Sequence, residues 1–205
     1  MIVLLMLGMA VGAAAGSTAT ARAHLGSGNQ LMQAERYAEA ADEFQKALGD
    51  DHTLTKARDQ LAICYFELRD YAHARPLLEQ MLLDKNSAGV AAYYLGRIDL
   101  IDRDFDSAIR RLRSIPRENP VLDELYYLGS AYFKQEKYAE AELSFLAGYA
   151  GMNQREAVIR GSDRALLRRP IEELSELYLR WERPDQAASW KMHLAEFDRK
   201  EADRR

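Results

Sequence analysis

The chain has 205 residues, of which 48% are hydrophobic and 29% charged, a composition typical of a folded protein and not of a disordered one. Its 28 basic and 32 acidic residues interleave to a formal net charge of -4, which argues against a nucleic-acid partner. The single cysteine, Cys64, excludes a framework of disulfides within the chain, so the fold depends on packing alone.

The first 23 residues differ in character from the rest. The stretch MIVLLMLGMAVGAAAG carries no charge, and Ala21-Arg22-Ala23 matches the small-x-small pattern that precedes a signal-peptidase cut. The apolar part, 2–16, is shorter than the roughly 20 residues of a spanning helix. We therefore expect 1–23 to be a secretory signal peptide and the protein to be exported, either periplasmic or secreted. Because no Lys or Arg precedes the apolar part, an uncleaved N-terminal membrane anchor remains the alternative.

A phrase of nine residues occurs four times in the remainder of the chain. The outer copies are RYAEAADEF at 36–44 and KYAEAELSF at 137–145, and DYAHARPLL and DFDSAIRRL lie between them. Each copy has an aromatic residue, an alanine three positions later and a large apolar residue four positions after that. The aromatic residues, at spacings of 34, 34 and 33, are Tyr37, Tyr71, Phe105 and Tyr138. Such a fixed period indicates stacked supersecondary units.

Each unit has the spacing of two helices. Apolar residues recur at i, i+1 and i+4 around Leu128 and Tyr132, and at i and i+4 from Ala141 to Phe145. Nine positions before each aromatic residue stands Gly or Ala, such as Gly129, which we expect to face the alanine of the second helix and to allow a close approach. One unit cannot bury its apolar face alone, so at least about three must stack.

These residues together resemble the tetratricopeptide repeat (TPR), a helix-turn-helix unit of 34 residues. The resemblance implies an all-α fold, an α-solenoid in which antiparallel helix pairs form a right-handed superhelix, with four clear repeats and one degenerate C-terminal repeat or cap. In this register 24–155 hold the four units, and 156–205 hold an irregular connection, a degenerate fifth repeat near 168–201 and a capping helix. The four units cover about 21–54, 55–88, 89–121 and 122–155.

The repeats depart from the TPR pattern at several positions. Asp99 occupies a position where two other copies have tyrosine, and Pro184 stands where the aromatic residue of the fifth unit belongs. Pro116 should end the second helix of the third unit early. The period is lost over 148–169, which predicts an irregular connection or a lone helical turn, and the two arginines before Pro170 indicate a loop.

The resemblance also implies a binding surface, because the concave face of a TPR array is the usual peptide-binding groove. A second stripe on the first helix of each unit, rotated about 100° from the packed stripe, faces this side. In this register the stripe consists of Leu25, Asn29, Met32, Asp59, Ile63, Phe66, Tyr93, Arg97, Leu100, Tyr126, Ser130 and Phe133. Eight of the twelve are apolar or aromatic, which is typical of an interaction site.

We expect this groove to hold an apolar or amphipathic segment of a partner protein. Phe66, Tyr93, Tyr126 and Phe133 would anchor it, and Arg97 and Asp59 would set its direction. Two alternatives stay open: the N-terminal segment or the last helices could fill the groove, or the stripe could be core if the register is shifted by one. The cluster with which some TPR proteins hold chaperone C-termini is matched only at Asn29, so we do not expect that partner.

The sequence offers no pattern typical of an enzyme. The four histidines have no metal-ligand spacing, and there is no phosphate-binding loop and no nucleophile elbow. Cys64 has no neighbouring His or Lys in the sequence that would lower the pKa of its thiol, so we expect it to be a core residue. We therefore expect no catalytic residue, cofactor, metal, small-molecule substrate or nucleic acid, and membrane contact only if 1–23 is an uncleaved anchor. The expected function is a non-catalytic adaptor or scaffold, and the alternative is a membrane-anchored structural subunit whose array is permanently buried in an envelope complex.

Overall fold

A computed structural model of the chain describes residues 2–115, 124–154 and 164–204. Side chains are described from residue 18 in the first of these ranges and from residue 166 in the last. Across the described residues the structure is all-α, with ten helices and no strand. The chain divides into two compact units, Met1–Ser87 and Ala88–Arg205.

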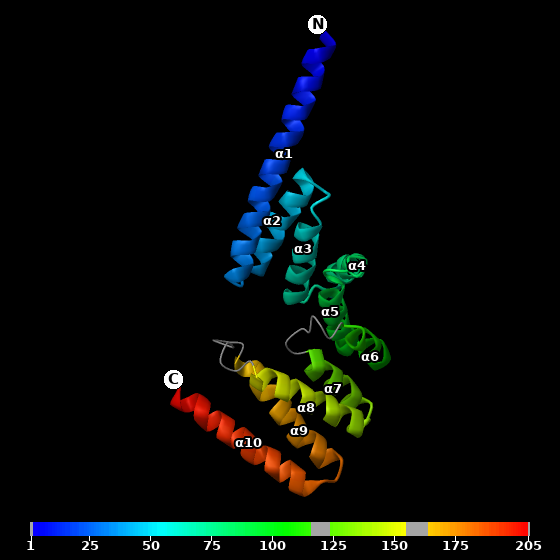
Figure 1. Cartoon of the computed structure of the whole chain (residues 1–205), viewed down its shortest axis with the longest axis vertical. Coiled ribbons are helices and arrows are strands. Elements are labelled where there is room, and N and C mark those ends of the chain that lie inside the picture. The colour runs from blue at the N-terminus through cyan, green and yellow to red at the C-terminus, as the bar shows by residue number, and fades with distance from the viewer. Residues whose placement is uncertain (1, 116–123, 155–163, 205) are drawn as a thin grey trace. The chain divides into compact units, whose positions relative to one another are not determined.

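Unit 1 contains two helix pairs, in which each helix packs on the next along the chain (Figure 1). Its helices are α1 (Ile2–Gln33), α2 (Tyr37–Asp50), α3 (Thr55–Glu67) and α4 (Tyr71–Met81). The core forms where α2 meets its neighbours, around the fully buried Phe44 and Cys64.

Unit 2 contains three further pairs, again with each described helix packed on the next (Figure 1). Its helices are α5 (Ala88–Ile101), α6 (Phe105–Arg113), α7 (Glu124–Lys134), α8 (Tyr138–Gln154), α9 (Arg164–Arg180) and α10 (Pro184–Asp203). Phe145 of α8 and Leu174 and Leu177 of α9 are fully buried in its main core cluster. The all-α fold of stacked helix pairs, predicted from the repeats, is confirmed.

The same turn joins the two helices in all five pairs. One residue in each turn has a positive φ of 56–64°, and the next residue donates its N–H to a carbonyl five positions earlier, the pattern of a Schellman motif. The positive-φ residues are Glu35, Arg69, Arg103, Glu136 and Glu182. Every second helix then begins two positions later, at the repeated aromatic residue or at Pro184. Proline suits the first position of a helix, because the N–H it lacks would have no helical partner there. The degenerate fifth repeat therefore keeps the turn of the other four.

The small residues of the first helices lie under large side chains of the second helices. A Cβ added to Gly129 would lie 2.6 Å from Phe145 Cδ1, and one added to Gly96 would lie 2.8 Å from Leu112 Cγ. The nearest side chain to each of these glycines is therefore the large residue one turn after the repeated alanine. That the glycines also face the alanine stays a prediction. The alanines are nonetheless fully buried, as Ala108 and Ala141 show.

The third and fourth pairs differ in how their second helices end. α6 stops at Arg113, before Pro116, as predicted, while Pro116 itself lies outside the described residues. α8 continues through Gly148 to Gln154, and α9 begins at Arg164 and contains Pro170. The loop predicted before Pro170 was thus wrong. The irregular connection expected over 148–169 is helical at 148–154 and at 164–169, so that expectation was wrong there, and 155–163 lie outside the described part of the chain.

The N-terminal segment runs directly into the first repeat, because α1 is one helix from Ile2 to Gln33. Residues 2–17 are described as backbone only, so the signal peptide at 1–23 stays a prediction. Helix α1 packs in unit 1 around residues 21–24, since Ala21 is fully buried and His24 Nδ1 lies 2.7 Å from Glu43 Oε2 on α2. Among the residues whose side chains are described, which begin at Thr18 in α1, no helix is both long enough and apolar enough to cross a membrane.

Candidate partner-binding surface

The residues of the predicted stripe lie on the first helices of four pairs and fall into two groups, one in each unit. Three of the proposed aromatic anchors, Phe66, Tyr93 and Phe133, are 4–6% exposed and so pack within the protein. The other members are partly exposed, namely Leu25, Asn29 and Met32 on α1, Asp59 and Ile63 on α3, Arg97 and Leu100 on α5, and Tyr126 and Ser130 on α7. The exposed part of the stripe is therefore smaller and less aromatic than expected.

Unit 2 contains a cavity of about 430 Å³ along this stripe. Four predicted residues line it, which are Arg97, Leu100, Tyr126 and Ser130. The other described residues of the lining are Ile101, Arg103, Phe105, Tyr127, Lys134 and Glu173. We call this feature the unit-2 cavity.

Arg97 is held in the unit-2 cavity by tyrosine rings. Its guanidinium carbon lies 4.8 Å from the ring centre of Tyr127 and 5.2 Å from that of Tyr93, within the range of cation–π attraction. Its Nη1 also donates a hydrogen bond of 3.1 Å to the Tyr93 hydroxyl. The buried Tyr93 therefore positions a cation of the surface and does not itself form an exposed anchor.

Glu173 brings a carboxyl group to the unit-2 cavity from α9, a helix outside the predicted stripe. The Tyr126 hydroxyl donates to its Oε1 at 3.4 Å. Burial raises the pKa of Glu173 above its ordinary value, and burial, followed by the charge of Glu173, raises the pKa of Tyr126 to about 12. The tyrosine therefore stays protonated near neutral pH and acts as a donor.

The rest of the lining combines an apolar wall with exposed cations. Leu100, Phe105 and Ile101 form the wall, and the side chain of Ile101 is 52% exposed. Lys134 ends α7, and Arg103 is the positive-φ residue of the turn between α5 and α6. The predicted stripe contains residues of the first helices only and therefore does not include Arg103 and Phe105. These two residues could have been located from the sequence, because they belong to the repeated turn and to the aromatic residue that follows it.

The group in unit 1 is smaller and contains one acidic residue. Burial raises the pKa of Asp59, and its Oδ1 lies 3.9 Å from Arg58 Nε. Neither of these two atoms has a hydrogen-bond partner among the described residues. Three other residues of this group are also partly exposed, namely Asn29 and Met32 on α1 and Ile63 on α3.

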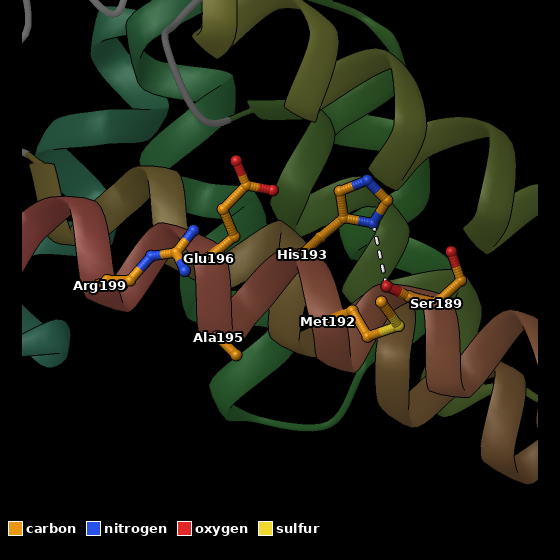
Figure 2. A pocket seen from close by; sticks show the side chains of 6 residues that line it. All are labelled: Ser189, Met192, His193, Ala195, Glu196 and Arg199. Atoms are coloured by element: carbon orange, nitrogen blue, oxygen red, sulfur yellow. Dashed lines mark hydrogen bonds between the residues drawn. The ribbon is translucent and has the colours of Figure 1, made fainter.

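A second hollow, of about 450 Å³, follows α10 (Figure 2). All six of its described lining residues belong to this helix, including Met192, which is 74% exposed, and His193, whose Nδ1 lies 3.0 Å from the Ser189 carbonyl oxygen (Figure 2). Because a single helix supplies the described lining, the hollow brings no opposing side chains of the described residues together.

The described residues hold no cluster typical of a metal site or a reactive thiol. No group of three or more His, Cys, Asp or Glu side chains among them could bind a metal ion. Cys64 is fully buried, and burial raises the pKa of its thiol to about 12. The thiol is therefore protonated near neutral pH and is a poor nucleophile.

Comparison with known proteins gives matches among solved structures alone, since no protein-family model and no curated protein sequence matches the chain. MamA 41-end from Desulfovibrio magneticus RS-1 superposes with a TM-score of 0.72 at 16% identity, covering 88% of this chain and 96% of that one. A crystal structure of MamA protein superposes with a TM-score of 0.69 at 17% identity, covering 90% and 94%. The chain shares the fold of MamA. At these identities the likeness shows the TPR-type fold of helix pairs and does not transfer any residue of MamA to this chain.

Proposed function

We propose that this chain is a non-catalytic adaptor or scaffold that holds a segment of a partner protein on its first-helix surface, with the unit-2 cavity as the principal contact. The observation that carries the proposal is the cavity itself, because four residues chosen from the repeat register line one hollow beside an exposed isoleucine. Exposed apolar groups in a hollow rimmed by polar side chains are typical of an interaction site.

The chemistry of the described lining of the unit-2 cavity supports a binding role. The unit-2 cavity has one carboxyl group, Glu173, and lacks a His, Cys or Ser–His arrangement in its described lining. The side chains that could hold a ligand there are an arginine on aromatic rings, exposed cations and an apolar wall. These groups bind and orient a segment of protein, and none is positioned to activate a nucleophile.

The protein is proposed to act outside the cytoplasm, following the apolar N-terminal segment. A second candidate is a membrane-anchored structural subunit of an envelope complex. The continuity of α1 favours this second candidate, because cleavage after Ala23 would remove Ala21, which is fully buried in unit 1. N-terminal sequencing of the mature protein separates the two candidates: a chain beginning at His24 supports export and cleavage, and a chain beginning at or near Met1 supports the anchor.

The binding proposal is tested by affinity capture from the native host with two matched variants of the full chain. Ile101→Asp places a charge in the apolar wall of the unit-2 cavity, and Leu143→Asp places the same charge on α8 at a side chain that is 69% exposed and outside the cavity lining. Proteins retained by wild type and Leu143→Asp but lost by Ile101→Asp support the proposal. Equal capture by all three forms refutes it.

A further inference from the structure

The unit-2 cavity has an unequal charge distribution. Its described lining contains three cations, Arg97, Arg103 and Lys134, and a single carboxyl group, Glu173. The chain as a whole is acidic, with a formal net charge of -4. A local excess of positive charge in an acidic protein indicates selection of a partner by charge complementarity.

Two of these cations keep their charge available to a ligand. Neither Arg103 nor Lys134 forms an ion pair within 4.0 Å to any described carboxylate, and both side chains are exposed. Arg97, by contrast, donates a hydrogen bond to the Tyr93 hydroxyl and lies over the Tyr127 ring, which restricts its side chain. An arginine that is already restricted loses less conformational freedom when a carboxylate binds it.

The carboxyl group of Glu173 offsets this excess only partly. It faces Tyr126 and Lys134 of α7, and on its own helix it has Glu172 and Glu176 as neighbours. Glu173 is partly buried and accepts a hydrogen bond from the Tyr126 hydroxyl, while Arg103 and Lys134 are exposed. The exposed charged residues of the described lining are therefore cations.

We propose that the unit-2 cavity binds an acidic, amphipathic segment of a partner protein. A bulky apolar side chain of the segment packs on Leu100, Ile101 and Phe105, and neighbouring Asp or Glu side chains pair with Arg103 and Lys134. This inference rests on the proposed function and adds the chemical class of the partner. It goes beyond the apolar or amphipathic segment expected from the sequence, because Arg103 and Lys134 were not part of the predicted stripe.

The test selects peptides of about 12 residues from a random displayed library on the full chain, and then measures the affinity of the selected peptides for variants. Arg103→Glu with Lys134→Gln removes the exposed cations, and glutamate is acceptable at this turn because Glu35, Glu136 and Glu182 occupy it in other repeats. Arg69→Glu with Lys191→Gln is the matched control, since Arg69 holds the same turn position in another pair and both residues lie outside the described cavity lining. Circular dichroism establishes that each variant is folded.

The proposal predicts that selected peptides are rich in Asp and Glu beside a bulky apolar residue. The affinity of these peptides should fall about tenfold in the cavity variant and change little in the control. Their affinity for wild type should also fall at high salt, because salt screens the charge pairs. Peptides that are neutral or basic and lose binding in Ile101→Asp overturn the acidic partner while leaving the proposed function intact. Acidic peptides that bind the cavity variant as tightly as wild type overturn the inference as well. A library that yields no binding peptide counts against both proposals.

Discussion

The close contact between Gly129 and Phe145 provides a quantitative test of how the repeats pack. A Cβ at position 129 would lie 2.6, 2.7 and 2.9 Å from three ring atoms of Phe145. Favourable carbon contacts lie at about 3.5–4.0 Å, so the ring or the helix must move by about 1 Å. Phe145 is fully buried against α9, which leaves the ring little room. Overpacking of this kind costs about 1–3 kcal/mol.

Gly151→Ala is the matched control for Gly129→Ala. Gly151 lies in α8 of the same unit, and an added Cβ there would meet no atom within 4 Å. Both variants gain about 1 kcal/mol from the higher helix propensity of alanine. The free energy of unfolding of Gly129→Ala should therefore lie about 1–3 kcal/mol below that of Gly151→Ala. Urea unfolding followed by circular dichroism measures the difference, and equal stabilisation of the two variants would refute the packing described for the repeat.

Three further predictions concern buried polar groups. Asp99 is 3% exposed and its Oδ2 accepts a 2.8 Å hydrogen bond from Arg111 Nε, so Asp99→Ala should lower the free energy of unfolding by about 3 kcal/mol. The double variant Asp99→Tyr with Arg111→Leu, which has the residues of the second repeat at these positions, should recover most of this loss. A double variant less stable than Asp99→Ala would contradict this. Burial raises the pKa of Glu173, so its protonated form stabilises the fold below the ordinary carboxyl pKa, and this stabilisation is lost as pH rises through the raised pKa. The advantage of Glu173→Gln over wild type should therefore be larger at about pH 7 than at about pH 4.5. Melting curves that show no such difference would mean that the carboxyl group is not buried. Cys64 should react with a thiol reagent far more slowly in the native chain than in denaturant, and equal rates would mean that the thiol is exposed.

The repeats could be predicted from sequence because their main determinants are local. The aromatic residue marks the start of each second helix, and Tyr37, Tyr71, Phe105 and Tyr138 all begin one. Pro184 does so as well, although the sequence pattern alone reads it as a departure. A proline replaces an aromatic residue at the first helical position without loss of the turn, because that position requires no N–H donor.

The errors arose where contacts between helices decide the outcome. The residues before Pro170 are helical because α9 packs on both α8 and α10, and tertiary packing overrides the local signal of proline. The aromatic anchors Tyr93 and Phe133 are buried because neighbouring rings and side chains cover them, which periodicity on a single helix does not reveal. Glu173 of α9 lines the same cavity as Tyr126, although the two residues are 47 positions apart in the sequence. The repeat pattern does not predict a contact at this separation.

The same burial changes what a useful binding variant is. Removal of the Tyr93 and Phe133 side chains would open the core of unit 2, because both are about 6% exposed, and a loss of binding would then report unfolding. Ile101 is the better position, since it lines the cavity and is half exposed at the end of α5.

The central claim is that a partner protein contacts the unit-2 cavity, and photocrosslinking tests it most directly. A photoreactive phenylalanine analogue is placed in the full chain at Ile101, at Leu143 or at Met192, the last two being 69% and 74% exposed outside this cavity. We expect irradiation in the native host to link a partner protein to position 101, and positions 143 and 192 to give no such product. A crosslink to the same partner from position 143 or 192, with none from position 101, would show that the partner does not contact the unit-2 cavity.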